Sequence, residues 1–460
     1  MPAVSAELLR RHDVTGPRYT SYPTADRFVD AFGEAEYATA LRQRRHGAAA
    51  LATPLSVYVH VPFCASLCYY CACNKIVTRR RERAHEYLDL LEREIALQTA
   101  ELGTGQPIAQ LHLGGGSPTF LSDAQLAALM YMLERSFQRQ PGAECSIEID
   151  PRTVDAGRLR ALSALGFNRI SLGVQDFDPA VQQAVHRVQP FGQVAALMEA
   201  ARGLPFDSVN FDLIYGLPRQ TEASFERTLQ QVVALRPDRI ALYGYAHLPE
   251  RFKPQRRIHA VELPAAGDKL AMLARALEAL QAAGYVHVGM DHFALPDDAL
   301  AVARRQGRLE RNFQGYSTQP DGDLLGLGVS AIGRIGASYS QNAKTLEDYA
   351  DLLAQGRLPV VRGLGLERDD VLRRAVIMAL MCHGRLDVES IELGFLIDFR
   401  STFGTEWAAL EELQAEGLVR LDDAGIQVTE LGWYFVRRVA MVFDRHLQAD
   451  RNRARFSRIL

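Results

Sequence analysis

Six short segments with β-strand character alternate with helical stretches through the middle of this 460-residue chain. The predicted strands are residues 56–61, 108–113, 145–150, 168–174, 208–213 and 239–245. In the first stretch between them, apolar residues recur at helical spacing, at Ala84, Leu88, Leu91 and Ile95. Strands that alternate with helices indicate βαβ units and a parallel sheet. Six such units predict an α/β fold, a partial (β/α)6 barrel of the TIM type rather than a complete eight-stranded barrel.

Each predicted strand has one aliphatic face and one polar or small face, because successive strand residues point to opposite sides of a sheet. The polar or small face carries Tyr58, His60, Ser146, Glu148, Asp150, Ser171, Gly173, Gln175, Asn210 and Asp212. A simple barrel would fill its interior with branched apolar residues. We therefore predict that Glu148, Gln175 and Asp212 face into the barrel and bind a ligand. The alternative is that these side chains pair with arginines or cap helices.

Four of the six cysteines lie within ten positions directly after the first predicted strand. Cys64, Cys68 and Cys71 have the spacing C-x3-C-x2-C, and Cys73 follows. Iron prefers soft thiolate ligands, so this spacing predicts a [4Fe-4S] cluster with three cysteine ligands and one iron left open for chemistry. One alternative is a zinc site completed by Cys73, although C-x2-C-x-C is cramped for a tetrahedron. A disulfide is the other, but a long chain without a secretory signal indicates a reducing compartment.

Two glycine-rich segments are further candidates for ligand contact. Gly114, Gly115 and Gly116 directly follow the second predicted strand, where they would let a ligand approach the backbone and leave amide groups free to bind it. This run is not the G-x-G-x-x-G dinucleotide fingerprint. Residues 325–333 are apolar and punctuated by glycines, which suits packing over a flat ligand or an irregular loop.

Charge and hydropathy exclude two classes of partner. A formal net charge of −3 argues against a general nucleic-acid binder, which would carry a basic excess. No apolar run approaches the ~20 residues of a membrane helix, and the N-terminus lacks the layout of a signal peptide. We expect a cytoplasmic protein with no nucleic-acid or membrane partner.

The two ends of the chain differ in character from the middle. Residues 1–50 are polar and are expected to form an N-terminal arm, either an extended lead-in or a flap over a site. Residues 51–340 are expected to form the catalytic domain with an extension. Residues 341–460 are expected to form a mostly helical, winged-helix-like C-terminal domain that covers the barrel, because helical segments precede a short hairpin pattern near residues 417–428.

The motifs together resemble a known family. The cysteine spacing after a strand, with aromatic Tyr70 before the third cysteine, resembles the radical S-adenosylmethionine (SAM) superfamily. Within it, seven motifs resemble the oxygen-independent coproporphyrinogen III oxidases of haem and porphyrin biosynthesis. They are RYTSYPTA, VHVPFCASLCYYCACNK, GGGSPT, EIDPR, GVQDF, NFDLIYGLP and RNFQGYST, which span nearly the whole chain.

The resemblance implies specific site residues and two SAM molecules per active site. The positions that match those serving the cluster-bound SAM are Tyr58, Gly115, Glu148 and Ile332. The positions that match those serving a second SAM are Tyr70, Gly116, Ser117, Gln175, Arg187, Asp212 and Ala246. The implied catalytic positions are Tyr58, Glu148, Cys73 and Gln314. Ser117, Ala65, Ala72 and Leu295 depart from the residues common in the family.

The activity implied by the resemblance is the conversion of coproporphyrinogen III to protoporphyrinogen IX without oxygen. A 5′-deoxyadenosyl radical removes hydrogen from a propionate, which then loses carbon dioxide and an electron and becomes a vinyl group; two propionates react. A reductant for the cluster and an electron acceptor are implied partners, and we expect a monomer. The alternatives are a haem chaperone, another tetrapyrrole-directed radical SAM enzyme, or a winged-helix regulator that binds DNA.

Overall fold

The computed structural model describes residues 6–12, 14–47 and 53–449, and within these residues one 12-stranded sheet organises the molecule. The strand order is β16-β15-β14-β13-β1-β4-β5-β6-β7-β8-β10-β9. All six predicted strands are confirmed as parallel neighbours. They are β1 (Leu55–Val61), β4 (Gln106–Gly115), β5 (Phe137–Ile149), β6 (Arg169–Gln175), β7 (Ser208–Tyr215) and β8 (Arg239–Gly244).

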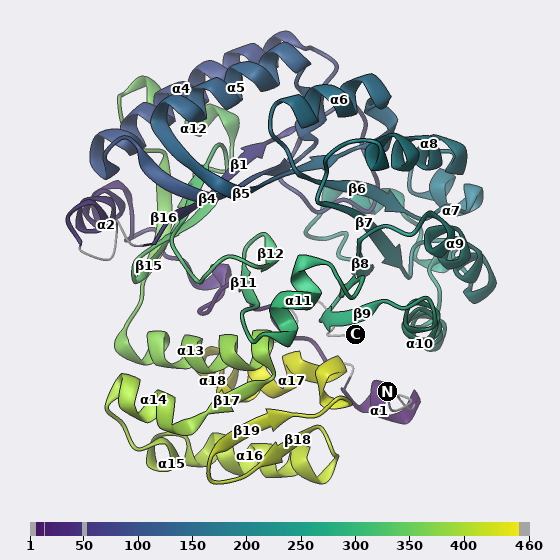
Figure 1. Ribbon diagram of the computed structural model, residues 1–460, viewed down its shortest axis with the longest axis vertical. Coiled ribbons are helices and arrows are strands. Elements are labelled where there is room, and N and C mark those ends of the chain that lie inside the picture. Colours follow the sequence, from purple (N-terminus) through teal and green to yellow (C-terminus); the bar gives the residue numbers. More distant parts are fainter. Residues whose placement is uncertain (1–5, 13, 48–52, 450–460) are drawn as a thin grey trace.

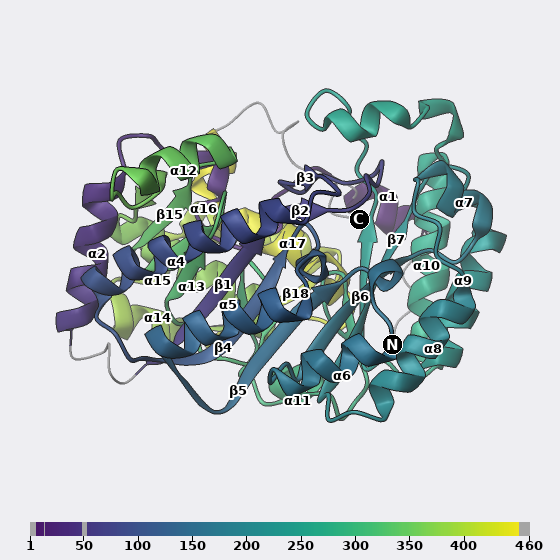
Figure 2. The ribbon, with the colours of Figure 1, turned by 90° about the horizontal axis from the view of Figure 1, so that it is seen from above.

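The helices that connect these strands lie outside the curved sheet, so the predicted partial (β/α)6 barrel is confirmed (Figures 1 and 2). They are α4 (Glu82–Leu102), α5 (Asp123–Ser136), α6 (Ala156–Ala164), α7 (Pro179–Ala184), α8 (Phe191–Arg202), α9 (Glu222–Leu235) and α10 (Ala266–Ala282). Side-chain caps fix where several begin; for example, Ser122 accepts a hydrogen bond from the Gln125 amide at the start of α5. No helix in the described part of the chain is long and apolar enough to cross a membrane.

The alternation predicted within the strands is also confirmed. The aliphatic faces of β1, β5, β6 and β7 are buried in one apolar cluster with the outer helices. The opposite faces of β5, β6 and β7 line an internal cavity, which contains Glu148, Gln175 and Asp212. The sheet therefore separates an apolar layer from a polar interior.

The segment between α10 and the C-terminal region closes the open side of the barrel. It contains β9 (Val286–Gly289), β10 (His292–Ala294), α11 (Ala299–Arg305), and the hairpin of β11 (Glu310–Asn312) and β12 (Gly315–Ser317). The hairpin lies inside the arc of the sheet (Figure 1). Gln110 on β4 donates a hydrogen bond to Ser317 Oγ at 3.4 Å, and Thr318 donates one to Glu144 on β5. These bonds join the hairpin to the inner face.

Most of the glycine-punctuated segment 325–333 belongs to the sheet rather than to an irregular loop. It contributes to β13 (Leu324–Leu327), which pairs in parallel with β1, and to β14 (Ile332–Ile335). A Cβ atom at Gly326 would lie 2.7 Å from the Ile332 carbonyl oxygen. The glycine there is required by close approach of the protein's own backbone. The sheet continues through β15 (Ser338–Asn342) and, after α12 (Leu346–Ala354), through β16 (Val360–Gly365).

The N-terminal arm is anchored deeply. It contains two helices that the sequence did not predict, α1 (Ala6–His12) and α2 (Glu34–His46). Between them, Tyr19 and Tyr22 are completely buried in the apolar cluster of the C-terminal region. The Tyr19 hydroxyl donates a hydrogen bond to Asp444 at 3.0 Å, and Arg437 Nε donates one to the Pro17 carbonyl oxygen at 2.9 Å. The arm thus joins the beginning of the chain to its end.

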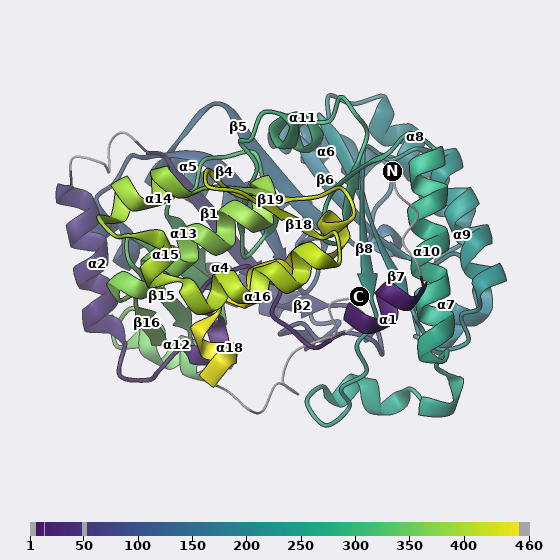
Figure 3. The ribbon, with the colours of Figure 1, turned by 90° about the horizontal axis from the view of Figure 1, so that it is seen from below.

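The C-terminal region has the predicted winged-helix-like arrangement. Its larger elements are α13 (Arg368–His383), β17 (Arg385–Asp387), α14 (Val388–Phe395), α15 (Phe399–Thr402), α16 (Gly404–Ala415), β18 (Val419–Leu421) and β19 (Gly425–Val428), followed by α17 (Val436–Ala440) and α18 (Arg445–Ala449). The three strands form an antiparallel sheet in the order β17-β19-β18 (Figure 1), and Figure 3 shows β18 and β19 beside α16. Tyr316 on β12 donates a hydrogen bond to the Met381 carbonyl oxygen at 3.0 Å, so α13 supports the hairpin from below. The domain limits at residues 50 and 340 stay a prediction.

Candidate active site

A cavity of about 440 Å³ lies between the inner face of the sheet, the cysteine loop and the β11–β12 hairpin. Thirteen of the predicted site residues line it: Cys64, Cys68, Tyr70, Cys71, Cys73, Gly115, Gly116, Ser117, Glu148, Gln175, Arg187, Asp212 and Gln314. They come from seven separate segments of the chain. Tyr58, Ala246 and Ile332 do not line this cavity, although Tyr58 contacts a residue that does.

The cysteine side of the cavity comprises Cys64, Cys68, Cys71, Asp150, Arg152 and Arg187. Arg187 Nη1 and Arg152 Nη2 donate to Cys68 Sγ at 3.4 and 3.6 Å. Asp150 pairs with both arginines, at 3.4 Å to Arg187 and 2.7 Å to Arg152. Although burial opposes its ionisation, Arg187 and Arg152 hold the pKa of Asp150 below its ordinary value. Arg187 and Arg152 thus place positive charge next to Cys68.

The surroundings of the three cysteines are more favourable with a cluster bound than without one. Burial, with Cys71 and Cys68 adding to it, raises the pKa of Cys64 to about 12. Thiolates this close together therefore need a bound cation. No three His, Cys, Asp or Glu side chains among the described residues, the cysteine triad included, are arranged around a single metal ion. Three soft sulfur donors fit an iron–sulfur cluster. All six cysteines are free, so the disulfide alternative is wrong.

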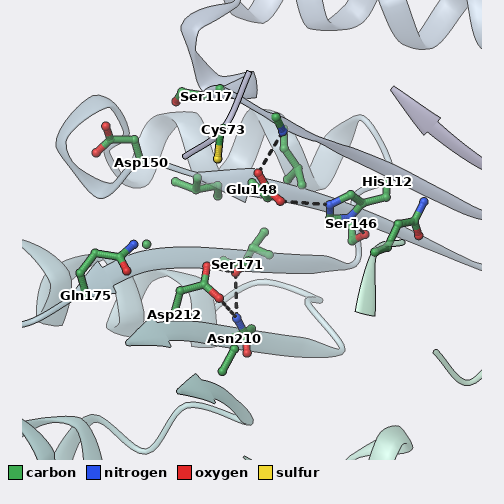
Figure 4. A pocket seen from close by; sticks show the side chains of 18 of the residues that line it. Cys73, His112, Ser117, Ser146, Glu148, Asp150, Ser171, Gln175, Asn210 and Asp212 are labelled. Atoms are coloured by element: carbon green, nitrogen blue, oxygen red, sulfur yellow. Dashed lines mark hydrogen bonds and ion pairs between the residues drawn. The ribbon is translucent and has the colours of Figure 1, made fainter. Parts of the chain in front are cut away.

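Cys73 lies beside this set and faces the same space. Its thiol shares a hydrogen bond with Cys71, which lowers the pKa of Cys71 to about 6 against the effect of burial, with Lys75 acting in the same direction. In Figure 4 the sulfur of Cys73 points toward Glu148. Cys73 is therefore close to the predicted ligand-binding carboxylate without belonging to the C-x3-C-x2-C triad.

Glu148 is held by a short chain of contacts that crosses three strands (Figure 4). One carboxylate oxygen accepts from the Gly115 amide at 3.1 Å, and the other lies 3.4 Å from His112 Nε2. The other ring nitrogen of His112 is hydrogen-bonded to Ser146 Oγ at 2.6 Å, and the ring stacks on Tyr58. Burial raises the pKa of Glu148, but His112 and the Gly115 amide outweigh it and the net shift is downward. Glu148 is therefore an anion at neutral pH.

Asp212 provides a second carboxylate on the opposite wall. It accepts hydrogen bonds from Ser171 Oγ at 2.9 Å and from Asn210 Nδ2 at 3.0 Å (Figure 4). Burial, together with the charge of Glu148, raises the pKa of Asp212 to about 6. Two carboxylates in one enclosed space favour a cationic ligand, because their mutual repulsion is relieved by a positive charge between them.

The amides of the glycine run are not free, which corrects the prediction made from the sequence. The Gly115 amide donates to Glu148, the Gly116 amide to the Val61 carbonyl oxygen at 2.8 Å, and the Ser117 amide to the Phe63 carbonyl oxygen at 2.8 Å. A Cβ atom at Gly116 would lie 2.7 Å from the Pro62 backbone. The run fastens the cysteine loop to β4 and positions Glu148.

The hairpin side of the cavity is lined by His292, Gln314 and Tyr316, and Arg311 packs on the Tyr316 ring without lining the cavity itself. The Arg311 guanidinium lies over the Tyr316 ring at 4.6 Å, and His292 meets the same ring edge-on at 5.4 Å. Arg18 of the N-terminal arm pairs with Asp291 and lies over Tyr243, which also lines the cavity. Burial lowers the pKa of His292, and the charges of Arg311 and Arg18 act in the same direction, so the ring is neutral.

Sequence reasoning overlooked several residues of this site. His112 could have been found, because it shares the strand face of Gln110 and follows the same alternation that identified Glu148. Arg152 and Asp150 stood in a recognised motif without a role. His292, Arg311 and Arg18 had no local pattern that places them at a cavity.

Comparison with known proteins defines the class first. The model of the Radical SAM superfamily matches residues 58–232, and that of the HemN C-terminal domain matches residues 366–435. A solved structure described as coproporphyrinogen III oxidase (HemN) from Escherichia coli, a radical SAM enzyme, has a TM-score of 0.91 and 46% identity, and the match covers 97% of this chain and 100% of that one. The chain is thus a radical SAM protein that carries a HemN-type C-terminal domain.

Full-length relatives define the family. A protein of Pseudomonas aeruginosa named oxygen-independent coproporphyrinogen III oxidase is 52% identical over 457 residues, which cover 99% of this chain and 98% of the relative. A protein of the same name from Escherichia coli is 47% identical over 453 residues, which cover 98% of each chain. The chain belongs to the family of oxygen-independent coproporphyrinogen III oxidases.

Proposed function

We propose that this protein converts coproporphyrinogen III to protoporphyrinogen IX without oxygen, as a radical SAM oxidoreductase of haem biosynthesis. The observation that carries the proposal is one cavity that joins a three-cysteine loop to two carboxylates and, on the other side, to the hairpin that carries the RNFQGYST segment. Each reacting propionate loses one hydrogen atom, one electron and carbon dioxide, and becomes a vinyl group. Two propionates react in turn.

The residues of this chain would bind the cofactors and orient the substrate. Cys64, Cys68 and Cys71 would hold a [4Fe-4S] cluster, and Arg187 and Arg152 would balance its negative charge through Cys68. When bound, the cluster and SAM supply the radical that removes the hydrogen atom. Glu148 faces this loop and is ionised, so it would bind the cationic part of a first SAM.

A second SAM would lie on the opposite wall. Asp212 and Gln175 face the cavity there, and Arg187 reaches the same space from the segment after α7. Tyr70, Gly116 and Ser117 complete the wall toward the cysteine loop. Tyr58 would act through His112, on which it stacks. Ala246 and Ile332 would contribute from outside the cavity lining.

The substrate would bind on the hairpin side, where Gln314 lines the cavity and can contact it. The arm and the C-terminal region enclose this side and keep water and oxygen from the radical. A reductant for the cluster, an electron acceptor, a monomeric state and a cytoplasmic location belong to the proposal as well.

An anaerobic turnover assay tests this function. Protein reconstituted with iron and sulfide is mixed with SAM, a reductant and coproporphyrinogen III, and vinyl products and carbon dioxide are measured. The proposal predicts both products, with SAM consumed in step. SAM cleavage without decarboxylation would refute the substrate assignment, and tight haem binding without turnover would favour a haem chaperone.

A further inference from the structure

Arg311 is a buried cation without a carboxylate partner among the described residues. Its side chain is on β11, and the residue is 3% exposed. Nε donates a hydrogen bond to the Arg18 carbonyl oxygen at 3.2 Å, and Nη1 has no hydrogen-bond partner in the part of the chain that the structure describes. Asp291 is paired with Arg18, the residue whose carbonyl oxygen accepts from Arg311.

The other buried arginines have more partners than Arg311. Arg187 pairs with Asp150 and Arg44 with Asp323, and Arg437 donates to the Gly16 and Pro17 carbonyl oxygens. Burying an unpaired charge destabilises the folded protein by several kcal/mol, because the ion loses its hydration. An ion of opposite charge can compensate for this loss. A buried arginine that the fold leaves without such a partner therefore indicates that an anion arrives from outside the chain.

The side chains around Arg311 have the same incomplete hydrogen bonding. Gln314 lines the cavity, and neither Oε1 nor Nε2 of its side chain has a hydrogen-bond partner among the described residues. His292 also lines the cavity, and its Nδ1 is likewise without a partner there. Arg311 and Tyr316 are paired across the hairpin, and the guanidinium lies on the ring that lines the cavity. Arg311, Gln314 and His292 thus each carry a polar atom without a hydrogen-bond partner among the described residues.

The geometry points to a carboxylate-binding subsite made by Arg311, Gln314 and His292, which holds a propionate of the tetrapyrrole that the reaction leaves intact. This inference rests on the proposed function and deepens it. A planar guanidinium matches a carboxylate through two parallel hydrogen bonds, and one uncompensated positive charge suits a monoanion. Anchoring one propionate here would present another toward the cysteine side.

The test measures binding of two unreactive ligands to reconstituted protein in the presence of SAM. Coproporphyrin III, the oxidised tetrapyrrole, carries free carboxylates, and its methyl ester has the same ring without the charge. Fluorescence titration gives the affinity of each for the wild type, Arg311→Gln and Arg311→Lys. Arg308→Gln is the matched control, because Arg308 is exposed near the same hairpin and its side chain is hydrogen-bonded to Gln306 alone among the described residues.

We expect Arg311→Gln to weaken the acid about 10- to 100-fold, the loss typical of one charge-assisted interaction, and to leave the ester unchanged. Arg311→Lys should recover part of the loss, and Arg308→Gln should bind both ligands as the wild type does. Equal affinity of Arg311→Gln and the wild type for the acid would overturn the inference. So would an equal loss for acid and ester, because it would mean that Arg311 only shapes the site.

Thermal unfolding of the ligand-free protein gives a second readout. If the charge of Arg311 is compensated only by a bound anion, Arg311→Gln should melt at the same temperature as the ligand-free wild type or at a higher one. Coproporphyrin III should then raise the melting temperature of the variant less than that of the wild type. A lower melting temperature without ligand, with ligand stabilisation unchanged, would show a structural arginine. The inference fails separately from the proposed function: a wild type that binds the acid through Arg311 but forms no vinyl product would refute only the latter.

Discussion

The cysteine side and the hairpin side of the cavity both carry arginines, but their charges are balanced in opposite ways. On the cysteine side, Arg187 and Arg152 share Asp150 and also donate to Cys68. On the hairpin side, Arg311 donates to a backbone carbonyl oxygen and meets no carboxylate among the described residues. In the first set two arginines share one carboxylate of the chain, whereas Arg311 in the second set has no carboxylate partner among the described residues.

This difference separates two uses of a buried charge. Asp150 fixes the arginines beside Cys68 before any cofactor binds, so the cysteine side is preorganised. The hairpin side is complete only when an anion is present, so it discriminates among ligands at a cost in stability. Changes on the two sides should therefore have opposite effects on the ligand-free protein.

The largest effect on activity is expected on the cysteine side of the cavity, at Cys68. Replacing Cys68 with Ala removes one of three cluster ligands, and we expect loss of bound iron and of turnover. Iron content and vinyl formation measure this. Cys145→Ala is the control, since Cys145 is buried on the aliphatic face of β5 and should keep its iron. Iron and turnover retained in Cys68→Ala would refute the cluster site.

The second test compares Arg187→Gln with Arg311→Gln in urea unfolding. Arg187→Gln removes a partner of buried Asp150, and we expect the free energy of unfolding to fall by about 2–3 kcal/mol at pH 7, less than for a fully broken pair because Arg152 remains. Arg311→Gln should cause no such fall. Because the folded-state pKa of Asp150 is depressed, its stabilisation is present above the unfolded pKa and is lost as the pH falls below about 4. Equal losses for the two variants would remove the distinction.

Asp212 gives a further test of the comparison, because its carboxylate lines the cavity and forms no ion pair with an arginine among the described residues. Its pKa is raised to about 6, so ionisation opposes folding at neutral pH. Asp212→Asn should raise the free energy of unfolding by about 1–3 kcal/mol at pH 7.5, and the gain should shrink as the pH falls through 6 and vanish below about 4. Asp297→Asn, at an exposed position, should change little. A gain that does not depend on pH would contradict this account.

The smallest effect is expected at His112, which positions Glu148 without being proposed as a ligand itself. His112→Ala should raise the dissociation constant for SAM about 5- to 10-fold, the loss of about 1 kcal/mol, while His112→Gln, which keeps a donor, should recover part of it. Equilibrium binding of SAM to reconstituted protein measures this. His85→Ala on the exposed face of α4 is the control. Equal losses for the Ala and Gln variants would argue against a role for the hydrogen bond.

Local patterns carried most of the information about the barrel. The period-2 alternation of β5, β6 and β7 was enough to predict both the strands and the inward direction of Glu148, Gln175 and Asp212, because one buried face imposes that period. The cysteine loop was equally visible, since its ligands lie within ten positions. The glycine run was misjudged, because only the folded chain shows that Val61, Phe63 and Glu148 accept from its amides.

The sequence by itself determined the parallel strands, the polar interior and the cysteine triad, since each depends on spacing within a short segment. Only the tertiary structure decided that the arm reaches Asp444, that β13 joins β1, and that Arg311 lies over Tyr316 with no carboxylate partner among the described residues. Those contacts join distant segments, and whether a buried charge finds a partner depends on every element packed around it. No short pattern in the chain encodes that balance.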